Sequence, residues 1–208
     1  MLKVEGLHVA IQSVIALRGL SLAVEDGTMV GLIGRNGAGK TTLLRSVMGH
    51  LIPTQGTITF NGQDLSALPP HARAGLGIGY MPEDRGLVPE LTVEENILIP
   101  VWVNPTLDPQ ERLALVYKVL PELLDMKDRR ALLLSGGQQK LVALARALAV
   151  GTRLLLLDEP FGALDTKVRK ELRRWLRRLH DDMHISSVFV THDQEEALEV
   201  ADRVVVMN

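Results

Sequence analysis

The chain has 208 residues, a length typical of one globular domain, and 46% of them are hydrophobic and 23% charged. This composition excludes a disordered or disulfide-framework protein, and the absence of cysteine excludes thiol catalysis and cysteine-bound metal. A net charge of −2 gives no overall attraction to nucleic acid. No apolar run is long enough to span a membrane, and charges stand where a signal peptide is apolar, so we expect a cytoplasmic protein.

Short apolar runs alternate along the chain with longer amphipathic stretches. Several of the runs are apolar at every position, which is typical of a parallel sheet covered by helices on both faces. The run 57–60 differs, because it alternates and precedes Asn61-Gly62, a hairpin signal that predicts an antiparallel flank. The strands predicted for the parallel sheet are 29–33, 78–81, 154–157, 188–190 and 204–206.

Helical periodicity fills the stretches between these strands. Residues 168–183 place their apolar side chains on one face, and similar faces follow Gly137 and Pro109. Residues 41–48 form another helical pattern, with Gly49 as its C-cap. The sequence therefore predicts helices that cover the sheet.

The stretch 83–133 shows little strand pattern and predicts a mostly helical insertion. The prediction is one domain, in which residues 1–82 and 134–208 form the core and 83–133 form a helical subdomain.

A phosphate-binding pattern, G-x-x-x-x-G-K-[ST], spans residues 34–41 between a predicted strand and a predicted helix. Its glycines let backbone N–H groups face phosphate, and the helix N-terminus adds a favourable dipole. We expect Lys40 to reach the β and γ phosphates and Thr41 to bind Mg²⁺; a plain glycine-rich turn is the alternative. The expected nucleotide contacts here are Gly34, Asn36, Gly37, Ala38, Gly39, Lys40, Thr41 and Thr42.

Two acids follow the four leucines of 154–157. The strand delivers their carboxylates to its C-terminal end, where open α/β sheets bind ligands. We expect Asp158 to hold Mg²⁺ through water and Glu159 to orient and polarise the attacking water. Alone this signal is weak, because many strands end in acids.

Two further motifs are ambiguous in isolation. Residues 134–138, LSGGQ, begin a helix and offer N–H groups and a hydroxyl to phosphate, but in isolation a serine N-cap with a flexible turn is the favoured interpretation. His192 follows the strand 188–190, where it would donate a hydrogen bond to a transferring phosphoryl group; a surface or capping histidine is the alternative.

In this order, the motifs resemble those of the nucleotide-binding subunit of an ATP-binding cassette (ABC) transporter, over nearly the whole chain. The resemblance implies an α/β fold: a P-loop NTPase core with a mainly parallel sheet, an antiparallel β flank and an inserted helical subdomain. It identifies 163–165 with the D-loop, His192 with the H-loop and Glu83 with the Q-loop position, where most cassettes have Gln.

The resemblance also implies ATP and Mg²⁺ as cofactors and assigns the site residues. Three residues are assigned to catalysis, namely Glu159, His192 and Lys40. The assigned metal ligands are Thr41, Asp158 and Glu83. Nucleotide contacts beyond the phosphate loop are assigned to Ser135, Gly137, Gln138 and Asp165.

A second ABC ATPase subunit and a membrane permease are the partners that the resemblance implies. In a head-to-tail dimer, Ser135 and Gly137 of one copy would close on the phosphate held by Lys40 of the other. The permease would contact the helical insertion, which puts the protein peripherally on the cytoplasmic face of the inner or plasma membrane. No nucleic acid partner is expected.

Subfamily patterns differ along the chain. Residues 1–150 resemble the branched-chain amino acid importer ATPase, and residues from 154 onward resemble a sulfate/thiosulfate importer ATPase. The prediction is ATP hydrolysis that powers import of amino acids. One alternative is a nucleotide-binding protein, or a fusion of two ABC ATPases, with weak turnover. Another is a soluble ABC protein of DNA repair or translation, which the lack of a coiled-coil insert or second cassette disfavours.

Three features depart from the family pattern or fall outside it. Ile11 stands where the family places an aromatic residue on adenine, which would weaken base stacking worth about 1–3 kcal/mol. The chain ends at Asn208, where family members continue, so a truncation is expected. A basic stripe on the helix 168–183 is interpreted as a solvated face, partly offset by Asp181 and Asp182, with membrane phosphates as the alternative. The stripe consists of Arg169, Lys170, Arg173, Arg174, Arg177 and Arg178.

Overall fold

The central sheet is parallel and consists of the strands that the apolar runs predict. The computed structural model describes residues 1–162 and 164–208, and the strand order in this sheet is β6-β7-β8-β3-β9. Every residue of β7 and β8 is buried, as expected for strands covered on both faces. The strands are β3 Met29–Gly34, β6 Ile78–Met81, β7 Leu154–Asp158, β8 Ser186–Val190 and β9 Arg203–Met207.

A second sheet, antiparallel, flanks the first and has the order β2-β1-β4-β5. The predicted hairpin signal is confirmed: Asn61 and Gly62 have φ angles of 51° and 80°, and β4 and β5 pair antiparallel on either side of them. The long hairpin of β1 and β2 adds two strands that were not among those predicted. The strands are β1 Leu2–Ile11, β2 Val14–Val24, β4 Gln55–Phe60 and β5 Gln63–Asp64.

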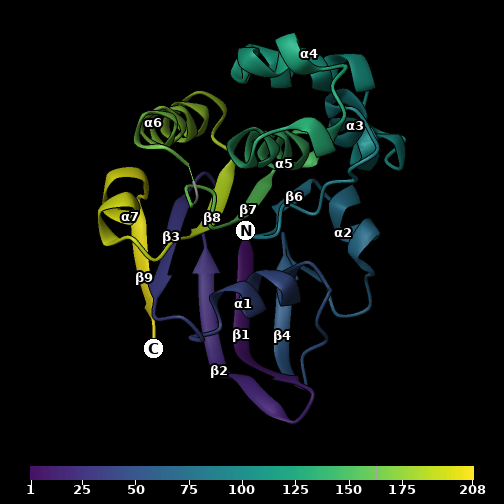
Figure 1. Cartoon of the computed structure of the whole chain (residues 1–208). Helices are drawn as coiled ribbons and strands as arrows, with labels where there is room; N and C mark the ends of the chain where they lie inside the picture. The colour runs from purple at the N-terminus through teal and green to yellow at the C-terminus, as the bar shows by residue number, and fades with distance from the viewer. Residues whose placement is uncertain (163) are drawn as a thin grey trace.

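Helices cover the parallel sheet from both sides (Figure 1). The predicted helices are confirmed as α1 Lys40–Val47, α4 Pro109–Val119, α5 Gly136–Val150 and α6 Thr166–Met183. Gly49, with φ 80°, ends α1 as predicted. The stretch 83–133 is mostly helical, with α3 Val93–Trp102, α4 and the 3₁₀ turns η1 Pro121–Met126 and η2 Ala131–Leu133. The remaining helices are α2 Pro70–Gly75 and α7 Gln194–Val200.

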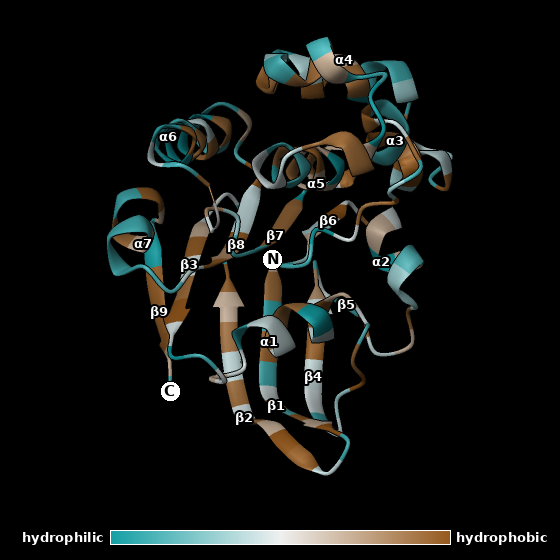
Figure 2. Cartoon of the chain, viewed as in Figure 1, coloured by the Kyte–Doolittle hydropathy of each residue, from teal (hydrophilic) through white to brown (hydrophobic). Residues whose placement is uncertain are grey.

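Alternate residues of the parallel strands belong to two apolar clusters, one on each face. Leu155 and Leu157 pack in a cluster with α3, α5, α6 and α7, whereas Leu154 and Leu156 pack in a cluster with α1 and the antiparallel sheet. Figure 2 shows the central strands in hydrophobic colours and α6 with a hydrophilic outer side. Within residues 1–162 and 164–208, no helix has the length and apolar character needed to cross a bilayer.

A buried arginine fixes the helix that follows the phosphate loop. Arg73 of α2 donates to the carbonyls of Ser46 and Val47 at the end of α1, and to those of Leu65 and Leu68. A cation at a helix C-terminus satisfies carbonyls that have no partner within the helix and complements the helix dipole. Arg73 thereby ties the end of α1 to α2 and to the segment between β5 and α2.

Candidate nucleotide site

The phosphate-binding pattern forms a tight loop between β3 and α1. Gly39 has a φ of 92°, and a Cβ there would overlap the Leu17 side chain of β2. Only glycine combines this left-handed backbone with so close an approach. The loop, which follows β3 of the parallel sheet, therefore packs closely against β2 of the antiparallel sheet. Helix α1 begins at the next residue, Lys40.

Lys40 is 7% exposed and folds back over this loop. Its Nζ donates to the carbonyl oxygens of Gly34, at 2.7 Å, and Arg35, at 3.1 Å. The ammonium group thus lies over the backbone that the pattern predicts to receive phosphate. A cavity of about 290 Å³ opens beside it. Its lining residues are Asn36, Gly37, Gly39, Lys40, Thr41, Thr42, Glu83 and Glu159.

Two of the predicted phosphate contacts stand apart from this cavity. Gly34 is in close contact with Met207 of β9, and Ala38 packs against the apolar cluster of the antiparallel sheet. Both residues shape the loop through their packing. The other six predicted contacts of the loop line the cavity together.

The three predicted metal ligands converge at the end of β7. The Thr41 hydroxyl donates to Asp158 Oδ1 at 3.2 Å, and both residues line a cavity of about 730 Å³ together with Glu83. Asp158 is 0% exposed, and its burial raises the pKa of the carboxyl to about 6, so at pH 7 most of it is ionised. Asp158 Oδ2 is buried without a hydrogen-bond partner in the described part of the chain.

An ionised, buried oxygen without a partner fits a divalent cation. Mg²⁺ is typically held by one or two carboxylates, with phosphate and water oxygens completing an octahedron. No group of three or more His, Cys, Asp or Glu side chains suited to a metal is found in residues 1–162 and 164–208. Metal binding here would therefore depend on the Thr41 hydroxyl and on phosphate as well as on Asp158.

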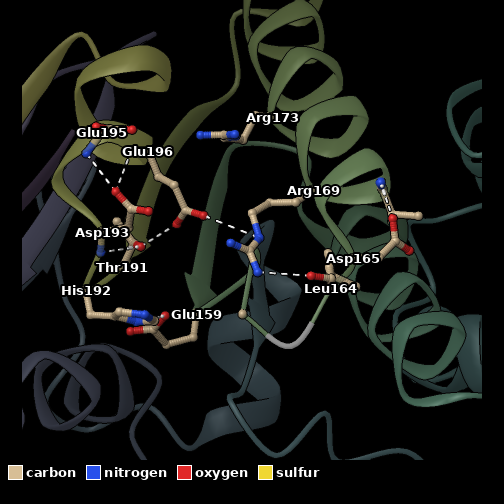
Figure 3. Close-up of polar contacts among 12 residues, drawn as sticks. Glu159, Leu164, Asp165, Arg169, Arg173, Thr191, His192, Asp193, Glu195 and Glu196 are labelled. Atoms are coloured by element: carbon tan, nitrogen blue, oxygen red, sulfur yellow. Dashed lines mark hydrogen bonds and ion pairs between the residues drawn. The ribbon is translucent and has the colours of Figure 1, made fainter.

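Glu159 and His192 meet at the ends of two adjacent strands (Figure 3). His192 Nδ1 lies 3.0 Å from Glu159 Oε2, and the Glu159 N–H donates to the Val190 carbonyl of β8. Glu159 has a φ of 51°, a left-handed conformation that costs a residue with a side chain about 1–3 kcal/mol. Burial raises the pKa of the Glu159 carboxyl, and His192 opposes this shift.

The signature residues lie apart from the phosphate loop. Ser135 is the N-cap of α5: its Oγ accepts from the Gln138 N–H, and Gln138 Oε1 accepts from the Ser135 N–H. Asp165 is the N-cap of α6, and its side chain accepts from two backbone N–H groups. Neither these three residues nor Gly137 line the cavity at Lys40. Ala163 of the predicted D-loop lies outside the described residues.

Lys140 is a polar residue of this region that the sequence analysis missed. It is 5% exposed, and its Nζ donates to the Gly162 carbonyl at 2.6 Å. It lies two residues past the LSGGQ motif, on a helix whose other buried positions are apolar. A lysine among these apolar positions was the sequence signal that could have identified it as buried and paired. Lys140 ties α5 to the segment between Glu159 and Asp165.

The basic stripe on α6 is only partly the solvated face that was expected: Lys170, Arg174 and Arg178 are exposed, whereas the other three are partly buried. Arg173 pairs with Glu199 of α7 at 2.9 Å. Arg177 pairs with Asp202 at 2.6 Å. It also pairs at 2.9 Å with Asp181 of the same helix, one of the two acids expected to offset the stripe. Arg173 and Arg177 therefore dock α6 against α7 and the segment that follows it.

Comparisons with known proteins find a matching family, similar sequences and similar structures. The sequence model of the ABC transporter family matches residues 17–162. The chain is 49% identical over 199 residues to "Sulfate/thiosulfate import ATP-binding protein CysA" of Pseudomonas syringae pv. tomato, covering 93% of this chain and 60% of that protein. It is 48% identical over 212 residues to "Sulfate/thiosulfate import ATP-binding protein CysA 1" of Chromobacterium violaceum, covering 100% and 58%. The chain thus spans about 60% of the length of these relatives.

Solved structures share the whole fold. The dimeric post-hydrolysis state of the ATP-binding cassette MJ0796, bound to ADP and phosphate, has a TM-score of 0.90 and 26% identity, and the match covers 100% of this chain and 94% of that one. A nucleotide-free cassette from an ABC transporter has a TM-score of 0.83 and 28% identity, with 100% and 87% covered. Family match, sequence identity and fold agree, and the chain belongs to the ABC transporter family as an ATPase cassette.

Proposed function

We propose that this cassette binds ATP with Mg²⁺ and hydrolyses it to power a separate membrane permease. The observation that carries the proposal is the convergence at the ends of β7 and β8. There, Thr41 contacts Asp158 and Glu159 contacts His192, beside the Lys40 loop. Groups for metal, water and phosphate thus share one edge of the sheet.

The chain's own residues divide the work of hydrolysis. Lys40 exchanges its bonds to the loop carbonyls for bonds to phosphate oxygens. Thr41 and Asp158 would hold Mg²⁺, which would neutralise charge on the phosphates. Glu159 accepts a proton from the attacking water, and its raised pKa makes it a stronger base than an exposed glutamate. His192 donates from Nδ1 to Glu159 and orients it, and with both ring nitrogens protonated it would also donate from Nε2 to a phosphoryl oxygen.

The proposal is tested by phosphate release from ATP. With excess Mg²⁺ we expect steady turnover, and with EDTA we expect turnover to fall to the blank. Asp158→Asn, which keeps the shape but removes the buried charge, is expected to raise the Mg²⁺ concentration needed for half-maximal turnover at least about tenfold. Asp182→Asn, at an exposed acid of α6, is the matched control. Absence of Mg²⁺-dependent turnover in the unmodified protein would contradict the proposal.

The site of one copy is proposed to be completed by the signature of a second. Ser135 and Gly137 lie outside the cavity at Lys40, so within one chain they do not enclose the phosphate. Two phosphate-binding helix N-termini on one chain suit two half-sites of a head-to-tail dimer. The permease is proposed to contact the helical stretch 83–133, with the cassette peripheral on the cytoplasmic face of the membrane.

For the transported substrate, the relatives favour sulfate or thiosulfate. The two relatives named above carry that name, and they match both the half of this chain that resembled the amino acid group and the half that did not. We therefore propose import of these anions, with amino acids as the alternative. Uptake of labelled sulfate and labelled leucine into vesicles that hold the cassette and its permease distinguishes the two.

Ile11→Tyr is expected to raise ATP affinity by up to about tenfold. Ile11 ends β1 and is 41% exposed, so a flat ring there can reach solvent-facing adenine. GTP affinity is expected to rise similarly, because stacking tolerates either base. Fluorescent-nucleotide titration measures both, with Val14→Tyr, at the cross-strand partner of Ile11, as the control. Unchanged affinity would mean that another residue covers the base.

A further inference from the structure

A buried carboxylate on α7 links two segments that flank the Glu159–His192 pair (Figure 3). Glu196 is 4% exposed. Its Oε2 accepts a 2.6 Å hydrogen bond from the Thr191 hydroxyl, and its Oε1 lies 3.8 Å from Arg169 Nε of α6. The carboxylate therefore faces the segment after β8 with one oxygen and α6 with the other.

Each end of this chain of contacts is attached to backbone. Thr191 Oγ1 accepts from the Asp193 N–H at 3.1 Å, so the two residues that flank His192 are bonded to each other. Arg169 Nη2 donates to the Leu164 carbonyl at 3.0 Å, next to Asp165. The segment bearing His192 and the segment leading into α6 are thus connected through one carboxylate.

The central link is not yet a hydrogen bond. Arg169 Nε is buried and has no hydrogen-bond partner among residues 1–162 and 164–208. A buried donor without a partner is costly, and here it lies within 4 Å of a carboxylate oxygen that would satisfy it. A small approach of α6 toward α7 closes the gap and moves both attached segments together.

We infer that Arg169 and Glu196 form a strut that holds His192, and through it Glu159, in register with the segment at Leu164 and Asp165. They are positioning residues, since neither lines the cavity at Lys40. This inference rests on the proposed hydrolysis of ATP. A misplaced His192 loosens the glutamate that orients water, so the strut acts on turnover and not on nucleotide binding.

The structure supplies a matched control for the strut. Arg173 and Glu199 join the same two helices one turn further on, at 2.9 Å. Among the described residues, no hydrogen bond joins this pair to Leu164 or Thr191. Glu196 is buried and Glu199 is half-exposed, so Glu199→Gln controls for the loss of an ion pair between α6 and α7.

The first experiment compares Glu196→Gln with Glu199→Gln. Glutamine keeps the volume and still accepts from Thr191, but it loses the charge that faces Arg169. For Glu196→Gln we expect kcat to fall about five- to twentyfold with KM for ATP within about twofold. For Glu199→Gln we expect both parameters within about twofold. Equal losses in the two variants, or a loss that appears in KM alone, would overturn the strut.

A double-mutant cycle tests whether the strut works as one unit. Thr191→Val cuts it at one end and Arg169→Met at the other. For a single connected device, the loss of kcat in the double variant equals that of the more damaging single variant. Losses that multiply would show two separate effects and would overturn the inference. Arg169→Lys, which keeps the charge but cannot reach both Leu164 and Glu196, serves where Arg169→Met does not fold.

Hydrogen exchange gives a readout that needs no activity. In the nucleotide-free protein, Glu196→Gln is expected to speed exchange at the Asp193 amide and in the first turn of α6, at least about threefold, whereas Glu199→Gln leaves both unchanged. Unchanged exchange in Glu196→Gln would overturn the strut. If the unmodified protein has no turnover, the proposed function fails while this measurement still decides the strut.

Discussion

Glu159→Gln is expected to reduce the rate of ATP hydrolysis at least about tenfold while ATP binding survives. The amide keeps the shape of the side chain and its contact with His192, but it cannot take a proton from water. Asp158 and Thr41, which lie beside it, keep the metal site. Because ATP then binds without being consumed, the closed dimer is expected to accumulate.

Steady-state phosphate release and fluorescent-nucleotide titration measure the two halves of this result, and sedimentation measures the dimer. Glu195→Gln, at an exposed glutamate three residues past His192, is the control and is expected to keep its turnover. Undiminished hydrolysis in Glu159→Gln would remove Glu159 from the mechanism. Loss of ATP binding would instead assign it to the nucleotide or the metal.

Mixing two inactive variants, Ser135→Arg and Lys40→Ala, is expected to restore part of the activity. Each alone should lose most turnover, since a bulky cation at 135 blocks closure on the partner's nucleotide and Lys40→Ala removes a phosphate contact. A heterodimer combines both defects in one site and leaves the other intact. While the dimer is sparse, activity should grow with the square of protein concentration.

The Ser135→Arg variant also loses a helix cap, so a second variant separates the two effects. Ser135→Asp keeps a good N-cap but places an anion where the partner's phosphate would dock. It is expected to behave like Ser135→Arg when mixed with Lys40→Ala. Turnover per chain that stays constant down to dilutions where only monomer sediments would contradict a site shared between chains.

The sequence predicted the parallel strands because a strand buried on both faces has no polar alternation to obscure it. The four leucines of β7 are an example. The positions of Asp158 and Glu159 were predictable for a related reason, because the end of this strand fixes where they lie. The turn at Asn61 and Gly62 was also predictable, because those two residues alone specify it. Features specified by a few neighbouring residues were therefore the predictable ones.

Features made by distant residues were not predictable in this way. Nothing local to α6 indicates that Arg173 finds Glu199, because the pairing depends on how two helices dock. The same holds for Arg73, whose four carbonyl partners lie in separate segments. The resemblance to two subfamilies gave the cassette correctly. The relatives' names agree with the sulfate/thiosulfate resemblance of residues from 154 onward, and not with the amino acid resemblance of residues 1–150 from which the substrate was predicted.

The cap on α5 has a consequence for how a second copy can dock. A serine hydroxyl has one proton and two lone pairs, and here only a lone pair is used, by the Gln138 N–H. The hydroxyl can still donate its proton to a phosphate oxygen, so capping the helix does not compete with binding the nucleotide of a second copy. The two interpretations of LSGGQ are therefore compatible, because the hydroxyl that caps the first turn of α5 keeps a proton to donate to a phosphate of the proposed second copy.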